Sequence, residues 1–590
     1  MLLFARGLCG QRRPAGTSKP HEQRTSAGPQ TASIPIPIAS RQSTAASLQA
    51  LVASVGRGLL LVVGRRGLLG VESPHFDVVF LVREVVEIVS QVVQLHNLSG
   101  LLSAAWINHV LVALVALDCW STPVLQYVYR DRQTLQRVLC VTCDIVITLG
   151  TCVIIPCVIF VPFALAFHYD TATFSDEVLY NDSLFANLVL QNRAVFALST
   201  VDGFTKLVPH FGILGGLRAV RGFLRPPVDA DAVKRDHIKT MDSAASPSTM
   251  WLRVVQSTTR LKMVRRVKAM IMHWAHVVLV LLGGVIVAIH VHAHASNSWL
   301  NAGCHQRVHP WLVSTASCSI LEFNCFRERA LSPNETALDG LNQHAVLILI
   351  LAHCPALVVP PVLGRLPNLI GMEIYNSTLI DWSGSASLDA AVHTRMAYFA
   401  MVHTNLSALP EGLMPRPMPS LLLDIELIAT NLTTLPDDLP QRWTAMSILY
   451  VEHSRLTALP TPLLRMNLFD VSVAHNSIES IEPLASLEAS PFRLSLAGNP
   501  LRNLTTELRD GVSIAFLSLL RTAIDELPSW VSEHVTDRVY LGGSPFCGAG
   551  DRVVAHATTL RVVDCTRPPA TQRSVGRYPL DMIEQLRVLT

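Results

Sequence analysis

The chain has 590 residues, of which 50% are hydrophobic and only 15% are charged, and its mean hydropathy is +0.37. These values exclude a disordered chain and a collagen, and they favour a protein embedded in a bilayer. The 12 cysteines are too few for a disulfide scaffold throughout, and the net charge of +3 says little about partners.

Residues 1–75 form a basic region that we expect to be disordered. Nine Lys or Arg lie between Arg6 and Arg66, against the single acid Glu22. The composition fits a cytosolic tail better than an organellar transit peptide, and Met1 to Phe4 is too short an apolar run for a secretory signal. Segment 48–64 is apolar enough to span or lie on a membrane, although an arginine at its centre would cost about 2.5–3.5 kcal/mol.

Residues 76–293 are predicted to form an α-helical multi-pass membrane bundle. Segments 101–117, 139–167, 194–217 and 270–289 are the expected spans. The loop 218–269 should face the cytosol, because residues 218–268 hold twelve Lys or Arg against four Asp. Five spans are preferred if 48–64 crosses the membrane, and four if it does not. Either count delivers the rest of the chain to the exterior, and we expect the plasma membrane as its location.

Two groups of polar residues fall in or beside these spans. Asp202 and Lys206 have i, i+4 spacing on the weakest span, so they form either a self-neutralised pair or part of an ion or substrate path. His290, His292 and His294 have no Cys or carboxylate at ligand spacing beside them. We therefore read them as interfacial histidines and expect no metal site.

Beyond residue 294 the chain is periodic. Reading LxxLxLxxNxLxxL, the apolar residue after the Asn position recurs with steps of 23, 27, 26, 24, 22, 23, 23 and 22 residues, starting at Ala356 and ending at Phe546. These periods predict an α/β leucine-rich-repeat solenoid of short parallel strands over residues 346–546. Only two Asn positions hold Asn, and the other seven hold Cys, Ser or Thr. The nine ladder residues are Cys354, Ser377, Thr404, Thr430, Ser454, Asn476, Asn499, Thr522 and Ser544.

Caps should close both ends of the array, over residues 294–345 and 547–590. Cys304, Cys318 and Cys325 precede the repeats, and Cys547 and Cys565 lie after the last one. We expect Cys547 to pair with Cys565. Cys354, within the first repeat, is either a disulfide partner or a buried thiol. Five glycosylation sequons support an exterior location. They begin at Asn334, Asn376, Asn405, Asn431 and Asn503.

The concave face of the solenoid is the expected ligand-binding surface. Acidic side chains there alternate with tyrosines in the middle repeats, which suits a basic or polar and partly aromatic partner, although an ordinary solvated face would also be polar. The residues assigned to this face are Glu373, Tyr375, Tyr398, Asp424, Glu426, Tyr450, Glu452, Asp470, Arg493, Arg538 and Tyr540.

Two stretches carry a family resemblance: LVREVVEIVSQVVQLHNLSGLLSAAWINHVLVALVALDCWSTPVLQYVYR (81–130) and NRAVFALSTVDGFTKLVPHFGIL (192–214). Over about residues 76–560 the chain resembles the oomycete multi-pass membrane proteins with carboxy-terminal leucine-rich repeats. The resemblance implies architecture and membrane location, and it supplies no catalytic or binding residues.

No GxxxxGK[ST], HRD with DFG, HExxH or GxSxG signature occurs, so we expect no enzyme, no cofactor and no nucleic-acid partner. The preferred function is a receptor-like or adhesive surface protein that binds an extracellular protein, peptide or glycan. The alternative is a transporter or channel that moves a solute past Asp202 and Lys206. Segment 251–270 in the cytosolic loop is basic and amphipathic, and it would bind either anionic lipid or a cytosolic signalling partner.

Overall fold

The computed structural model describes residues 73, 75–169, 173–224, 247–296, 303–334, 336, 340–505, 507–548, 561–566 and 578–586. The chain divides into a helical unit, made of residues up to 98, 104–161 and 193–290, and a repeat unit, made of residues 99–103, 162–192 and 291–590. The predicted span 48–64 lies outside the described residues.

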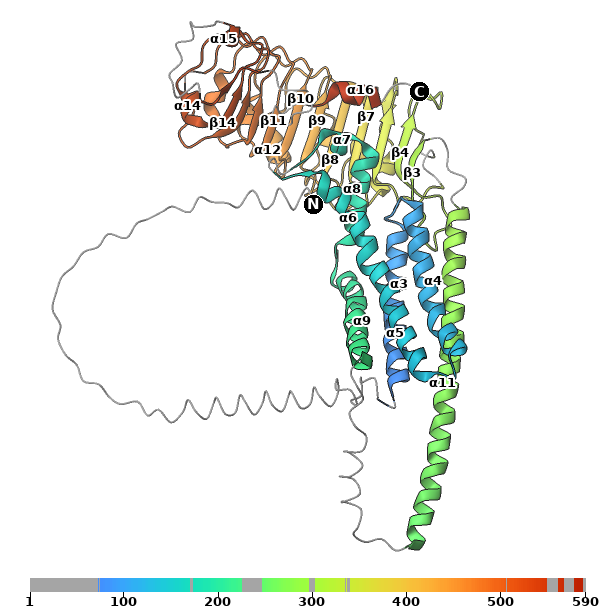
Figure 1. Ribbon diagram of the computed structural model, residues 1–590. Helices are drawn as coiled ribbons and strands as arrows, with labels where there is room; N and C mark the ends of the chain where they lie inside the picture. The colour runs from blue at the N-terminus through green and yellow to red at the C-terminus, as the bar shows by residue number, and fades with distance from the viewer. Residues whose placement is uncertain are drawn as a thin grey trace, which may run out of the picture. The chain divides into compact units, whose positions relative to one another are not determined.

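The helical unit contains α3 (Phe76–Ser99), α4 (Ala105–Val128), α5 (Gln133–Leu149), α9 (Thr200–Leu224) and most of α11 (Pro247–Ser296) (Figure 1). A π-helical turn, η2 (Gly150–Ile154), joins α5 to α6 (Ile155–Ala166). Three helical segments of the described chain are long and apolar enough to cross a membrane: Ala105–Val128, Gln133–Ala166 and Arg266–Ala295.

A fourth candidate span is broken. α8 (Asp182–Val195) and α9 pass the same test together but meet at a bend of 66°. The helix expected at 194–217 therefore begins later, at Thr200, and the helix expected at 101–117 begins at Ala105 and continues to Val128. The amphipathic segment 251–270 belongs to the continuous helix α11.

α3 is a helix that was not predicted from the sequence. Apart from His96 and Asn97 near its end, its exposed residues are valines, with Val82 58% and Val89 53% exposed, whereas Glu84 and Glu87 are each 1% exposed. The helix has 24 residues, which corresponds to a length of about 36 Å. Its charged residues lower its hydropathy, but they point into the unit, so the usual polarity of a water-soluble helix is reversed.

The repeat unit is a leucine-rich-repeat solenoid, as predicted. Thirteen strands form one sheet in the order β15-β14-β13-β12-β11-β10-β9-β8-β7-β5-β4-β3 with β6 paired to β7, and every neighbouring pair is parallel except β3 with β4. The bounds are β3 Cys304–Arg307, β4 Cys318–Asn324, β5 Ile348–Ala352, β6 Leu357–Val358, β7 Gly371–Asp381, β8 Tyr398–Asn405, β9 Asp424–Ile428, β10 Ile448–Glu452, β11 Asp470–Ser472, β12 Arg493–Ser495, β13 Ile514–Ser518, β14 Val535–Tyr540 and β15 Val563–Asp564.

Short helical turns line the other side of the solenoid. They are η3 (Pro361–Arg365), η4 (Gly384–Ala386), η5 (Glu411–Leu413), α12 (Leu439–Arg442), α13 (Thr461–Leu464), η6 (Glu482–Ser486), α14 (Trp530–His534) and α15 (Pro545–Gly548). Leucine, isoleucine and methionine side chains from successive repeats form one continuous core between these turns and the sheet. No repeat buries its apolar face alone, because each one is covered by its neighbours.

The nine predicted ladder positions share a backbone signature. The residue before each one has a positive φ, and the nine residues are His353, Asn376, His403, Ala429, His453, His475, Gly498, Arg521 and Gly543. The chain therefore turns off the strand at the same point of every repeat. At Asn476, the buried amide donates to Val451 O at 2.7 Å and Val473 O at 3.0 Å, and its oxygen accepts from Leu456 N at 3.2 Å.

Replacing this amide should destabilise the solenoid. Asn476→Ala leaves one buried N–H and at least two carbonyl groups without their partner, so we expect a loss of about 3 kcal/mol in the free energy of unfolding. Thermal unfolding followed by circular dichroism measures it, with the exposed Thr457→Ala as the control. Equal melting temperatures for the two variants would contradict the structural role of Asn476.

Candidate functional site

The residues predicted to bind a ligand do share the concave face of the sheet, but most of them are buried. Glu373, Tyr375, Glu426, Tyr450, Glu452, Asp470 and Tyr540 are each no more than 6% exposed. Tyr398, Asp424 and Arg493 are half-buried and Arg538 is exposed. Acids and tyrosines of a solvated binding surface would not be covered to this degree.

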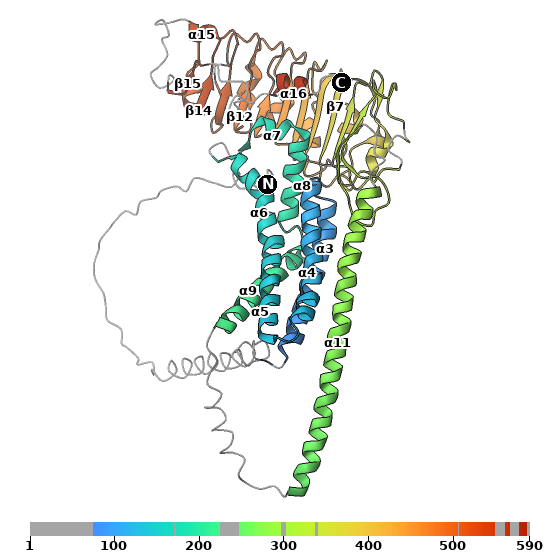
Figure 2. The same ribbon diagram turned by 45° about the vertical axis from the view of Figure 1, so that its right-hand side comes forward.

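The chain itself covers this face. α7 (Asp176–Tyr180) and α8 come from the segment before the solenoid, and α16 (Leu580–Leu586) comes from the segment after it. Figure 1 and Figure 2 both show α7 and α16 lying against strands β7 to β10. Ala186 and Leu190 of α8 and Ile583 of α16 share one apolar cluster with the concave side chains Tyr375 and Tyr450.

Two acids of the concave face bind these segments directly. The Tyr180 hydroxyl donates to Glu426 Oε1 at 2.6 Å. The backbone N–H of Tyr578, two residues before α16, donates to both carboxylate oxygens of Glu452 at 3.1 Å. The rings of Tyr180 and Tyr578 also meet edge to face with centroids 5.2 Å apart, so the two covering segments contact each other on the sheet.

A further tyrosine is enclosed where α8 meets the sheet. The Phe185 ring packs edge-on against Tyr398 with centroids 5.3 Å apart, and the Tyr398 hydroxyl donates to Glu373 Oε1 at 2.7 Å. Burial, and then the nearby Glu373 carboxylate, raise the pKa of Tyr398 well above its usual range. The hydroxyl therefore remains a hydrogen-bond donor throughout the physiological pH range.

The later repeats are less covered. Arg493 forms an ion pair with Asp470, whose other neighbour is the Tyr450 hydroxyl at 2.9 Å. Beside them, Phe469 and Phe492 stack with centroids 4.8 Å apart, and each is 38% exposed. This part of the solenoid exposes the two stacked phenylalanine rings, and the charge of Arg493 is paired with Asp470.

In the helical unit, the Asp202–Lys206 pair forms as predicted from its spacing. Lys206 Nζ lies 2.9 Å from Asp202 Oδ2, and Asp202 also accepts from Leu198 N at 3.0 Å and from Gln94 Nε2 at 3.2 Å. Lys206 further donates to Phe196 O at 2.8 Å. These hydrogen bonds satisfy both charged groups within the first turns of α9. The pair is therefore better interpreted as self-neutralised than as part of an ion or substrate path.

A group of charged residues that the sequence analysis missed lies among α3, α4 and α5. Glu84, Glu87, Asp118 and Asp144 are each no more than 2% exposed, and Arg83 pairs with Asp144. α9 reaches the same place, since a Cβ at Gly212 would lie 2.2 Å from Glu87 Oε2. The sequence does carry a signal for this group, because Arg83, Glu84 and Glu87 interrupt a run of valines. Such a segment is too charged for a typical membrane span unless the charged side chains face the interior of the helical unit.

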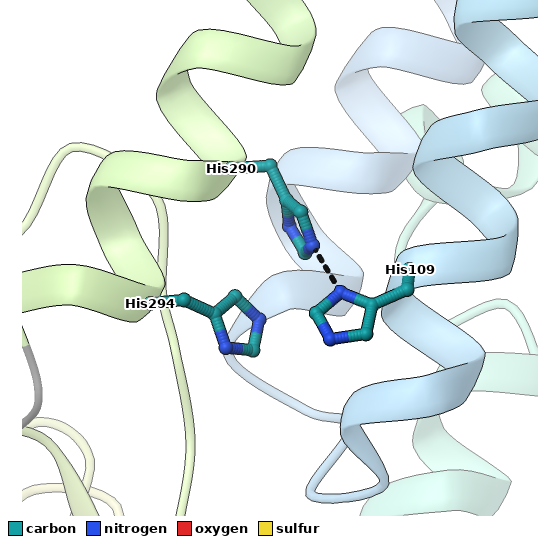
Figure 3. Close-up of side chains that lie close together, drawn as sticks. All are labelled: His109, His290 and His294. Atoms are coloured by element: carbon teal, nitrogen blue, oxygen red, sulfur yellow. Dashed lines mark hydrogen bonds between the residues drawn. The ribbon is translucent and has the colours of Figure 1, made fainter.

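The structure brings a further histidine, His109, next to His290. His109 Nδ1 lies 2.7 Å from His290 Nε2 in a hydrogen bond, and Figure 3 shows His294 one turn further along α11. His109 comes from α4, 181 positions earlier, so no local spacing pattern reveals it. The hydrogen bond gives His290 a protein partner inside the helical unit.

The cysteines form three disulfides: Cys304–Cys318, Cys325–Cys354 and Cys547–Cys565. The last pair is confirmed, whereas the reading of Cys354 as a free buried thiol is wrong. The two pairs before the repeats close the hairpin of β3 and β4 and tie β4 to the first ladder position. Of the sequon asparagines, Asn334, Asn376, Asn405 and Asn503 are exposed, whereas Asn431 is half-buried and its amide donates to Asn405 Oδ1.

No protein-family model and no curated protein matches the chain. Similar solved structures are leucine-rich-repeat proteins. A protein of Leptospira interrogans is 15% identical over 34% of this chain and 67% of its own, with a TM-score of 0.23. The repeat domain of the type III effector XopL is 15% identical over 45% and 84%, with a TM-score of 0.29, and Listeria monocytogenes InlP is 14% identical over 38% and 62%, with a TM-score of 0.27.

Weakening one contact should loosen the covering segments. Tyr180→Phe removes the hydroxyl that binds Glu426, which should cost about 1–3 kcal/mol of docking free energy. Hydrogen–deuterium exchange of the amides in 176–192 should therefore become faster. Tyr169→Phe is the matched control, because Tyr169 is 76% exposed. Identical exchange in the two variants would show that Tyr180 does not hold the segment.

Proposed function

We propose that the chain is a receptor-like, five-span membrane protein whose repeat face recognises polypeptide and is occupied by the chain's own segments. The observation that carries the proposal is the burial of Glu426, Glu452 and the concave tyrosines beneath α7, α8 and α16. These contacts define the chemistry of the partner. It donates hydrogen bonds from tyrosine hydroxyls and backbone N–H groups to the carboxylates of the concave face, and it places aliphatic side chains beside them.

Membrane embedding is supported by the polarity of α3. Valines on the outside of a helical unit and carboxylates within it suit a hydrocarbon solvent, because apolar side chains then face lipid and polar ones face protein. α3 takes the place of segment 48–64 as the first of five spans, followed by α4, α5 with α6, α9 and α11. The count of five then no longer depends on residues 1–75.

The connections agree with this topology. Residues 99–103, between α3 and α4, belong to the repeat unit: the Ser99 hydroxyl accepts from Trp311 N at 3.0 Å, and the Ser103 hydroxyl donates to Asn187 Oδ1 in the α6–α9 connection at 2.6 Å. These two connections and the repeats therefore belong on one side. The basic segments 1–66, 130–137 and 218–268 fall on the other side, which the positive-inside rule makes the cytosol.

Glycan mapping tests the orientation. If the repeats are extracellular, endoglycosidase should shift the mobility of the full-length chain, and the shift should shrink in the Asn405→Gln, Asn431→Gln double variant. The sequons Asn334, Asn376 and Asn503 stay intact as internal controls. A membrane-inserted chain without glycan on any of the five sequons would place the repeats in the cytosol and overturn the proposed orientation.

Recognition of polypeptide is tested with the chain's own covering segment. A chain ending at residue 577 should bind an acetylated peptide of residues 578–590 added in trans, measured by fluorescence anisotropy in nanodiscs. Glu452→Gln in that chain should weaken binding at least several-fold, because it replaces the charged acceptor of the Tyr578 N–H by a neutral one. The full-length chain should bind much less peptide, since α16 competes for the same face.

The decisive control is a peptide with Ile583→Asp, which places a charge at a side chain that is 3% exposed in the docked state. It should not bind. A folded truncated chain that binds neither peptide would contradict the proposed recognition function.

The alternative function, a transporter or channel, retains support from the polar residues inside the helical unit. The Asp202–Lys206 pair has its bonds satisfied at the start of α9, so the buried carboxyl groups of α3, α4 and α5 are the better place to look for it.

A further inference from the structure

Four carboxyl groups from three helices face one another inside the helical unit. Glu84 and Glu87 come from α3, Asp118 from α4 and Asp144 from α5, and Glu84, Glu87 and Asp144 all interact electrostatically with Asp118. Glu87 Oε1 accepts from Thr148 at 2.6 Å, and Asp144 pairs with Arg83. We call these four residues the acidic cluster.

Few charges oppose the cluster. Among the described residues, Arg83 is the cation that interacts with all four acids. The other titratable groups around them are the thiols Cys119 of α4, Cys140 and Cys143 of α5 and Cys152 of η2. α9 contributes Gly212, whose carbonyl oxygen lies 3.5 Å from Arg83 Nη1.

Polar atoms in and beside the cluster lack protein partners. Both carboxyl oxygens of Asp118 make no hydrogen bond within the described residues. The same is true of the Gln91 amide, one turn beyond Glu87 at 4% exposed, whereas the Thr122 hydroxyl, at 0% exposed, is hydrogen-bonded to Glu84. A buried carboxyl group and a buried amide without a hydrogen-bond partner among the described residues indicate that the cluster holds something besides its own side chains.

Electrostatics identifies the class of ligand. Four ionised carboxylates and one guanidinium would leave a net charge of −3 out of contact with water, at a cost of several kcal/mol for each uncompensated ion. A divalent cation would need several converging oxygen ligands. No three carboxyl-bearing residues in the described ranges bring ligand oxygens within 4.8 Å of one another. Protons need no such convergence, because each neutralises one carboxylate.

We propose that Glu84, Glu87, Asp118 and Asp144 form a proton-binding site that exchanges with solvent along the polar face of α3. That face continues from Glu87 through Gln91 to Gln94, at spacings of four and three residues. Gln94 donates to Thr205 and, at 3.2 Å, to Asp202 next to the break before α9. Each exchange moves one proton between a carboxyl oxygen and water, and no other reactant takes part.

This inference rests on the membrane embedding proposed above, and infrared spectroscopy of the full-length chain in liposomes tests it. At neutral pH the wild type should show the carbonyl stretching band of protonated carboxylic acids. Asp118→Asn and Glu84→Gln should each remove part of that band, and both substitutions keep the size of the side chain. Asp131→Asn, whose side chain is 89% exposed in the α4–α5 loop, should leave the band unchanged.

The route is tested by the time course of the band shift after transfer to D₂O. Gln94→Leu should slow the shift relative to the wild type, because the leucine interrupts the polar face. An unchanged rate would overturn the route, and a band that never shifts would overturn exchange itself.

Three other outcomes bear on the site. Absence of the band in the wild type, or a band unaffected by either substitution, would overturn proton binding. A band present in choline chloride but lost in sodium chloride would replace the proton by a monovalent cation and also overturn the proposal. Flotation of the liposomes separates these failures from a failure of membrane embedding, since a chain that does not embed does not float.

Discussion

The hydrogen bond between Tyr180 and Glu426 joins residues that are 246 positions apart. One of them lies between two candidate spans and the other lies in the fourth repeat strand after the last span. A contact of this kind requires both segments to be on the same side of any membrane. It therefore constrains the number of crossings between them to be even, which α9 and α11 satisfy. The segments around this contact, α7, α8 and α16, also remove much of the concave face from solvent.

The repeat unit was predictable because its constraints are local and recur. Each repeat needs a turn after its strand, a small polar or amide side chain at the ladder position and inward apolar residues. All three features can be recognised in the amino-acid sequence. The substitution of Ser, Thr or Cys for Asn did not obscure the register, because the positive φ sits on the preceding residue. The Cys547–Cys565 pair followed from their position after the last repeat.

The parts that escaped prediction depend on contacts between distant segments. The burial of Glu84 and Glu87 on α3 was missed because hydropathy sums charges without regard to the direction in which the side chains point. Nothing in the concave residues reveals that Tyr578 and Phe185 will cover them, since a polar and aromatic strand face looks the same whether its partner is internal or external. His109 joins His290 across 181 positions, and Cys325 binds the Cys354 that the periodic pattern had assigned to the ladder.

The location of α16 has a consequence for biosynthesis. The segment that completes the cover of the sheet is made after all thirteen strands, so the part of the concave face that α16 covers stays open while the repeats emerge from the ribosome. A chain whose synthesis stops before residue 578 would fold its repeats and still display an apolar surface of the kind that chaperones bind. Full covering of this surface therefore requires synthesis as far as α16.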